Sequence, residues 1–132
     1  MMRQSIEAWI YHPEDREIFL LKVEDETVSF WQPITGGIES GESPEEACLR
    51  EIKEETGLLL HRSNLTSLGD FTVKIDENLS IHKNLFLVLT EQKDIQLSDE
   101  HVGAQWVALD KVSSQLYWPS NQETFEIITE KL

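Results

Sequence analysis

The chain has 132 residues, of which 39% are hydrophobic, and a formal net charge of −14 at pH 7. This length and composition predict one globular domain over residues 1–132 and exclude a disordered chain or one held by internal disulfides, since Cys48 is its single cysteine. The negative charge argues against nonspecific binding to nucleic acid or to an anionic membrane, which requires a basic surface. A polyanionic substrate would therefore need metal ions to bridge it to the protein.

The N-terminal residues, Met1 to Ser5, lack the long apolar core of a secretory signal peptide. No apolar run approaches the roughly 20 residues that are needed to span a bilayer. A single cysteine is consistent with a reducing compartment. We therefore expect a cytoplasmic protein.

Extended segments are predicted for the first part of the chain. Apolar residues alternate with others over residues 4–11, and residues 17–23 contain a second compact apolar run. Turn chemistry at His12 and Pro13 between the two segments predicts a hairpin. Residues 28–34 form another short extended piece, which enters a glycine-bearing loop.

A helix is predicted from about Pro44 to about Thr56. Ser43 is a suitable N-cap, and Pro44 occupies the first helical position. Glu46 completes a Ser-x-x-Glu capping box. Gly57 is a good C-terminal stop because glycine tolerates the left-handed conformation.

The rest of the chain is predicted to be mainly extended, with a helix at the end. Two of its segments are joined by a turn and predict a long antiparallel hairpin. The expected extended segments are 58–60, 68–75, 79–89 and 105–109, and the expected terminal helix is 121–132.

Three glutamates gather on one face of the predicted helix. At 100° per residue, Glu51, Glu54 and Glu55 fall within an arc of about 100° that borders the side carrying Cys48 and Ile52. Like charges at this spacing repel by a few tenths of a kcal/mol per exposed pair. A hard divalent cation such as Mg²⁺ or Mn²⁺ would remove this penalty, because it takes oxygen ligands. A merely solvated helix face would also account for the three glutamates, and their pattern alone leaves both interpretations open.

The loop before the helix could supply a further oxygen. Glycine lets the backbone approach another group closely. The backbone carbonyl near Thr35 or Gly36 is therefore a candidate metal ligand.

The spacing over residues 36–58 resembles the Nudix box, Gly-x5-Glu-x7-Arg-Glu-U-x-Glu-Glu-x-Gly-U, in which U is a bulky aliphatic residue. Every fixed position is filled, by Gly36, Glu42, Arg50, Glu51, Ile52, Glu54, Glu55, Gly57 and Leu58. The chain thus resembles the Nudix (MutT-like) hydrolases. The resemblance implies an α/β fold, an α/β/α sandwich with a mixed, partly antiparallel central sheet. It also implies an enzyme that hydrolyses phosphoric anhydride bonds in a nucleoside diphosphate linked to another group.

The resemblance further implies roles for the residues of the box. Glu51, Glu54 and Glu55 would be ligands of Mg²⁺ or Mn²⁺, and one of them could assist the attacking water. Arg50 would orient these glutamates through charge-assisted hydrogen bonds. Glu42 would support the loop and the helix start or contribute to the metal network.

Many members of the family add a carboxylate from a later loop as a metal ligand or base. Asp99 and Glu100 are the candidates in this chain, and we prefer Glu100. Loop charges without a catalytic role are the alternative.

Flanking pieces favour one subfamily. Residues 30–36, Phe-Trp-Gln-Pro-Ile-Thr-Gly, resemble the lead-in of bacterial dihydroneopterin triphosphate pyrophosphohydrolases, which also act on dATP. Residues 118–121, Trp-Pro-Ser-Asn, resemble a later piece of the same enzymes. This chain differs from those enzymes at residues 24–26, which are Glu-Asp-Glu here, whereas those enzymes tend to carry basic residues. The expected reaction is hydrolysis of a nucleoside or pterin triphosphate to a monophosphate and pyrophosphate.

Candidate residues for the heterocycle lie on both sides of the box. Trp31 and Trp118 could stack on a base or pterin while Asn121 reads its edge. Packing in the core or at the rim is the alternative for both tryptophans. Lys22, Lys74 or Lys83 could contact phosphate, and the sequence does not select among them.

Other functions remain open at this level. Within the enzyme class they are hydrolysis of oxidised dNTPs, of ADP-ribose or nucleotide sugars, and of dinucleoside polyphosphates. A noncatalytic, nucleotide-sensing Nudix domain is a further alternative, which retention of the whole box disfavours. The resemblance also allows a homodimer.

Overall fold

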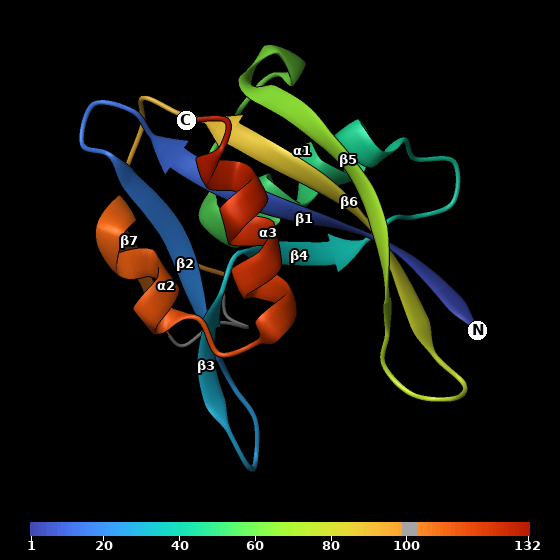
Figure 1. The fold of residues 1–132 in the computed structure, drawn as a ribbon. Coiled ribbons are helices and arrows are strands. Elements are labelled where there is room, and N and C mark those ends of the chain that lie inside the picture. The colour runs from blue at the N-terminus through green and yellow to red at the C-terminus, as the bar shows by residue number, and fades with distance from the viewer. Residues whose placement is uncertain (99–102) are drawn as a thin grey trace.

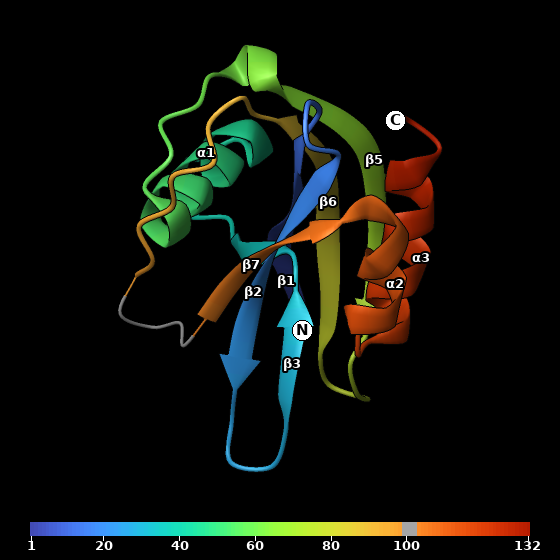
Figure 2. The same cartoon turned by 90° about the vertical axis from the view of Figure 1, so that its left-hand side faces the viewer.

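The computed structural model describes residues 1–98 and 103–132. Glu100 and Asp99, the candidate late-loop carboxylates, lie outside the described residues. The described part is a layered structure in which a central sheet separates one long helix from two others (Figures 1 and 2).

The sheet is mixed, as the family resemblance implies. Its order is β3-β2-β1-β6-β5, with β4 also paired to β1 and β7 also paired to β2. The pairing of β1 with β6 is parallel, and the other pairings of these strands are antiparallel. Among the described residues the strands are β1 (Met2–His12), β2 (Glu17–Glu24), β3 (Ser29–Gln32), β4 (Ile34–Gly37), β5 (Leu65–Lys74), β6 (Ser80–Leu89) and β7 (Gly103–Ala108).

Helices cover both faces of the sheet. The helix α1 (Pro44–Thr56) lies on one face, and α2 (Val112–Gln115) and α3 (Pro119–Thr129) lie on the other (Figure 2). Two short 3₁₀ turns, η1 (Arg62–Asn64) and η2 (Leu109–Lys111), complete the described helical elements. None of these helices is long and apolar enough to cross a membrane.

From Ser5 onward, strand β1 is buried on both of its faces. Ile6 and Ile10 pack with Ile52 of α1 in one core cluster. Trp9 belongs to a second cluster on the other face, where its ring lies 5.5 Å from that of Phe125 in α3. Because successive side chains of a strand point to opposite faces, this one strand supplies both cores.

Several predicted elements differ in detail. The extended piece 28–34 is two strands, of which β3 pairs with β2 and β4 pairs with β1. The break falls at Pro33, which has no backbone N–H to donate. Residues 58–60 are not a strand. The last helix begins at Pro119 and not at Asn121, because proline is well suited to the first helical position. The predicted hairpins β1–β2 and β5–β6 are both confirmed.

Candidate active site

The start and end of α1 are formed by the predicted caps. Ser43 Oγ accepts a hydrogen bond from the Glu46 backbone N–H at 3.1 Å, and the Ser43 N–H donates to Glu46 Oε1 at 3.0 Å. Pro44 occupies the first turn, and Gly57 ends the helix with φ of 77°. Strong caps at both ends fix the register of the glutamate-bearing turns between them.

Arg50 joins three of the Nudix-box carboxylates. Its Nε and Nη2 atoms donate to the two oxygens of Glu42 at 2.7 and 2.9 Å. Its Nη1 donates to Glu51 Oε1 at 2.9 Å and reaches Glu54 Oε2 at 3.3 Å. Nη2 also donates to the Gly37 carbonyl oxygen at 2.8 Å, which ties the helix to β4. A planar guanidinium with five donors suits this task better than an ammonium would.

The pKa values of the carboxyl groups in the cluster shift in opposite directions. The Arg50 guanidinium lowers the pKa of Glu42 to about 2, chiefly by hydrogen bonding. The same bonds raise the pKa of Arg50. Burial raises the pKa of Glu51, against the opposite effect of Arg50, and the charges of Glu54 and Glu55 raise it further. Glu51 is therefore a partly desolvated carboxylate beside other negative charges, an environment that a cation would stabilise.

The three predicted metal ligands differ in exposure. The side chain of Glu54 is 53% exposed, and that of Glu51 is 13% exposed. Glu55 is buried, and its Oε2 accepts a hydrogen bond from Ser98 Oγ at 3.2 Å. Glu55 thus lies deeper than the helical wheel suggests, with its carboxylate engaged by the segment that leads into the undescribed residues.

Gly36 of β4 lies directly against Glu51. A Cβ atom at position 36 would be 2.1 Å from Glu51 Cδ, far inside contact distance. Gly36 is paired with Ile6 of β1, so its backbone is fixed by the sheet. The absence of a side chain at this position is what allows the Glu51 carboxylate to sit beside the strand.

These residues fit a divalent cation by their chemistry. Among residues 1–98 and 103–132, no three histidine, cysteine, aspartate or glutamate side chains already converge as a set of metal ligands. The guanidinium of Arg50 lies among the carboxylates instead. The candidate metal ligands are nevertheless all oxygen atoms, the ligand type that Mg²⁺ and Mn²⁺ prefer. The carboxylates come from adjacent turns of α1, and they lie next to the backbone of β4 at Gly36. Their role as ligands, with that of Thr35 and Gly36, stays a prediction.

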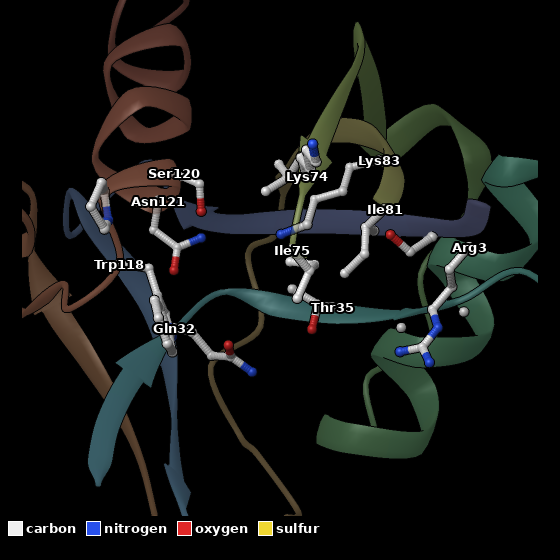
Figure 3. A pocket seen from close by; sticks show the side chains of 15 residues that line it. Arg3, Gln32, Thr35, Lys74, Ile75, Ile81, Lys83, Trp118, Ser120 and Asn121 are labelled. Atoms are coloured by element: carbon white, nitrogen blue, oxygen red, sulfur yellow. The ribbon is translucent and has the colours of Figure 1, made fainter. Parts of the chain in front are cut away.

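A cavity of about 610 Å³ lies on the other side of β4 from the glutamates. Gly36 and Gly37 form part of its wall, so the same two glycines border both the cavity and the Arg50 cluster. Figure 3 shows the cavity between the start of α3, the β5–β6 hairpin and β4. Its other described lining residues are Arg3, Ser5, Gln32, Thr35, Val73, Lys74, Ile75, Ile81, Lys83, Trp118, Pro119, Ser120 and Asn121.

The cavity brings together two of the three predicted heterocycle-binding residues. Trp118 and Asn121 line it, and Trp118 packs edge-on against the rings of Phe30 and Tyr117 at 5.3 and 4.8 Å. Trp31 is not among the lining residues and packs against the core cluster of Trp9, as in the packing alternative. The part of Trp31 in substrate binding stays a prediction.

The cavity also gathers cations that the sequence did not select. Arg3, Lys74 and Lys83 all line it, and no aspartate or glutamate is among its described lining residues. A chain of net charge −14 therefore offers one locally basic recess. Pairing of strands distant in sequence creates it: Arg3 comes from β1, Lys74 from β5 and Lys83 from β6.

Sequence reasoning missed one residue behind the cavity, Glu7. Glu7 is 0% exposed, because α3 covers the face of β1 that carries it. Its carboxylate accepts hydrogen bonds from Trp9, Lys83 and Asn121. A carboxylate inside an otherwise apolar strand was the available signal, since buried charges require partners.

The layered fold of sheet and helices agrees with the family comparison. The NUDIX domain profile matches residues 1–128, and the chain belongs to the Nudix family. It is accordingly a hydrolase of the MutT-like type.

Individual relatives cover the chain to different extents. It is 28% identical over 136 residues to a dihydroneopterin triphosphate diphosphatase of Haemophilus influenzae. That alignment covers 93% of this chain and 85% of the relative. It is 33% identical over 121 residues to an octanoyltransferase of Myxococcus xanthus. That alignment covers 89% of this chain and only 33% of the relative. The chain thus spans about a third of the length of that second relative.

The fold is shared with solved structures. The dihydroneopterin triphosphate pyrophosphohydrolase of Escherichia coli superposes with a TM-score of 0.82 at 22% identity, over 98% of this chain and 96% of that one. At this identity the likeness concerns the fold, and it confirms the predicted Nudix sandwich.

Proposed function

We propose that this Nudix hydrolase is a pyrophosphohydrolase that uses Mg²⁺ or Mn²⁺ to cleave a nucleoside or pterin triphosphate to a monophosphate and pyrophosphate. One observation carries the proposal. Gly36 and Gly37 stand between the Arg50–glutamate cluster and a cavity that offers cations and a ring-stacking side chain. A ligand whose heterocycle occupies the cavity would reach the glutamates with its phosphates.

The glutamates would hold the metal, which when bound supplies charge neutralisation for the phosphates and activation of water. Glu51 and Glu54 on adjacent turns would be the main ligands, with Glu55 behind them. Arg50 would keep Glu51 and Glu54 in place through its present hydrogen bonds. Glu54 is the most exposed of the three and holds Arg50 only weakly, so it is the carboxylate best placed to accept a proton from water.

The cavity residues would bind the rest of the substrate. Arg3 and Lys74 would contact phosphate oxygens, to which their charge is attracted. Trp118 is 41% exposed and would stack on the heterocycle. The relative from Haemophilus influenzae, a dihydroneopterin triphosphate diphosphatase by name, supports a pterin or related ring in this position.

The test replaces Glu54 with Gln and measures pyrophosphate release that depends on Mg²⁺. The amide keeps the size of the side chain but cannot accept the proton or ligate with charge, so we expect kcat to fall about 100-fold or more. Glu45→Gln is the matched control, because Glu45 lies on the same helix in the first turn and should affect turnover little. Near-normal turnover of Glu54→Gln would defeat the proposed site.

The substrate needs a separate experiment. A panel of dihydroneopterin triphosphate, dATP, 8-oxo-dGTP, ADP-ribose and diadenosine tetraphosphate, with identified products, distinguishes the enzymatic alternatives. We expect a monophosphate and pyrophosphate from a triphosphate substrate. Tight binding with no hydrolysis of any compound would instead support a sensing domain.

A further inference from the structure

Residues 90–98, which follow β6, form an irregular segment that lies against α1. In Figure 2 this segment runs from the end of β6 past the helix. Two of its apolar side chains, Ile95 and Leu97, pack against the core cluster that contains Ile52 of α1. Segment 90–98 is therefore held next to the helix that bears the glutamates, where its polar groups can contact that helix.

Lys93 anchors the first half of segment 90–98 to the sheet. Its Nζ atom donates to Asp15 Oδ2 at 2.6 Å and to Glu17 Oε1 in β2. The ammonium also lies 5.5 Å from the centre of the Trp106 ring in β7, and Trp106 Nε1 donates to the Lys93 carbonyl oxygen at 3.2 Å. Because these contacts join the segment to two strands, its path toward α1 starts from a fixed point.

The second half of segment 90–98 meets the C-terminal end of α1. The Gln96 N–H donates to the Thr56 carbonyl oxygen at 2.8 Å, so it satisfies one of the carbonyls that a helix end leaves unpaired. A Cβ atom at Gly57 would lie 3.3 Å from Gln96 Cβ, so glycine there lets the segment come close to the helix. Two residues after Gln96, Ser98 Oγ donates to Glu55 Oε2 at 3.2 Å. The segment thus contacts two adjacent residues of α1.

Glu55 differs in this respect from the two other proposed metal ligands. Arg50 Nη1 donates to Glu51 at 2.9 Å and reaches Glu54 at 3.3 Å, so a side chain of the same helix orients both. Glu55 is buried and accepts a hydrogen bond from a residue 43 positions further along the chain. The terminal torsion of a glutamate has broad preferences of its own. A donor on a second, anchored element therefore restrains the plane of the Glu55 carboxylate.

We propose that Ser98 is a positioning residue for the metal ligand Glu55. The proposal rests on the proposed function in that Glu55 binds the metal ion. Hydrogen-bond partners of metal-ligating carboxylates orient the ligand, and their loss lowers metal affinity about 10- to 100-fold. Ser98 acts through Glu55 and contacts neither the metal nor the substrate.

The test measures binding of Mn²⁺ alone to the metal-free protein by electron paramagnetic resonance, which requires neither substrate nor turnover. We expect Ser98→Ala to raise the Kd for Mn²⁺ about 10-fold. Ser67→Ala is the matched control, because Ser67 is an exposed serine of β5 and its loss should leave the Kd unchanged. Binding of Mn²⁺ to Ser98→Ala with the affinity of the wild type would overturn the proposal.

A second pair of variants keeps the size of the side chain constant. Ser98→Thr and Ser98→Val have the same shape and differ in the hydroxyl, so they remain informative if Ser98→Ala does not fold. We expect Ser98→Thr to bind Mn²⁺ like the wild type and Ser98→Val to bind it as weakly as Ser98→Ala. Equal affinities of the threonine and valine variants would contradict the proposal.

A double-mutant cycle shows whether Ser98 acts through Glu55. Glu55→Gln alone should weaken Mn²⁺ binding, because it removes a charged ligand. Adding Ser98→Ala to Glu55→Gln should cause no further loss, since the carboxylate that Ser98 orients is then absent. A further loss of about 10-fold would show that Ser98 affects the metal independently of Glu55, against the proposal.

Stability and catalysis are measured separately on the same variants. A purely structural hydrogen bond would lower the thermal unfolding temperature of Ser98→Ala in EDTA and leave the Mn²⁺ affinity of the folded protein unchanged, which would refute the positioning role alone. Loss of Mn²⁺ affinity that is coupled to Glu55, without pyrophosphate release from any triphosphate of the panel, would refute the proposed function alone. Unchanged Mn²⁺ affinity in Glu55→Gln would refute both, because Glu55 would then not be a ligand.

Discussion

Gly36 and Glu51 are in such close approach that a single methyl group at position 36 would occupy the place of the Glu51 carboxylate. The two residues come from different elements, β4 and α1, and the Arg50 bond to the neighbouring Gly37 carbonyl holds these elements together. The strand thus positions the carboxylate sterically on one side, while Arg50 holds it by a hydrogen bond on the other.

We predict that Gly36→Ala lowers kcat strongly while Gly37→Ala does not. The new Cβ would displace Glu51, and a misplacement of about 1 Å can cost about 100-fold in rate. At Gly37 the nearest atom to a new Cβ is Gln4 O at 3.9 Å, an ordinary contact. Pyrophosphate release and Mg²⁺ titration of both variants provide the measurement. Equal activities of the two variants would show that the close approach has no catalytic consequence.

Replacing Arg50 with Lys should reduce kcat about 10- to 100-fold, although the charge is retained. Lysine cannot hold Glu42 with two hydrogen bonds and Glu51 with a third, so the glutamates lose their common support. Arg62→Lys is the control, because among the described residues the Arg62 side chain makes one long hydrogen bond, to Ser43 Oγ at 3.4 Å. Steady-state kinetics and thermal unfolding separate the catalytic effect from a loss of stability. Full activity of Arg50→Lys would contradict the orienting role.

Acid should remove the stabilisation contributed by Glu42. Its pKa in the folded protein is about 2, below its ordinary value of 4.5. A lowered pKa means that the contribution is fully present above about pH 4.5 and is lost as the pH falls toward 2. We therefore expect wild type to exceed Glu42→Gln in stability at pH 6, and the difference to shrink on acidification. Urea unfolding at a series of pH values measures it; a difference that stays constant down to pH 3 would argue against the Arg50–Glu42 pair as its source.

Cys48 should be unreactive in the native protein. Burial raises the pKa of its thiol to about 12, and the charges of Glu45 and Glu51 act in the same direction. The reactive thiolate is therefore scarce at pH 8, and the side chain is 0% exposed. Labelling with a thiol-specific reagent should be slow in buffer and fast in urea, with Cys48→Ser as the blank. Rapid labelling without denaturant would mean that α1 opens readily from the sheet.

The secondary-structure elements that the sequence predicted are formed by residues close to one another in the chain. The Ser43 and Gly57 caps, the helix between them and the β5–β6 hairpin arise from interactions within a few turns or one connection, so local patterns identify them. The spacing of Glu51 and Glu54 on the helix follows for the same reason. The split of the 28–34 segment could not be read in this way, because β3 and β4 choose different partner strands.

The cavity depends on tertiary structure. Asn121 and Glu7 are 114 residues apart in the chain, and Lys83 and Glu7 are 76 apart, so no local pattern relates them. Their contact exists only because β1 pairs with β6 and α3 packs across the same face. The sequence by itself determined the family, the glutamate helix and hence the chemistry of phosphoric anhydride hydrolysis. Only the tertiary structure decided which side chains line the cavity that we propose holds the heterocycle, because strand pairing and helix packing bring distant residues together.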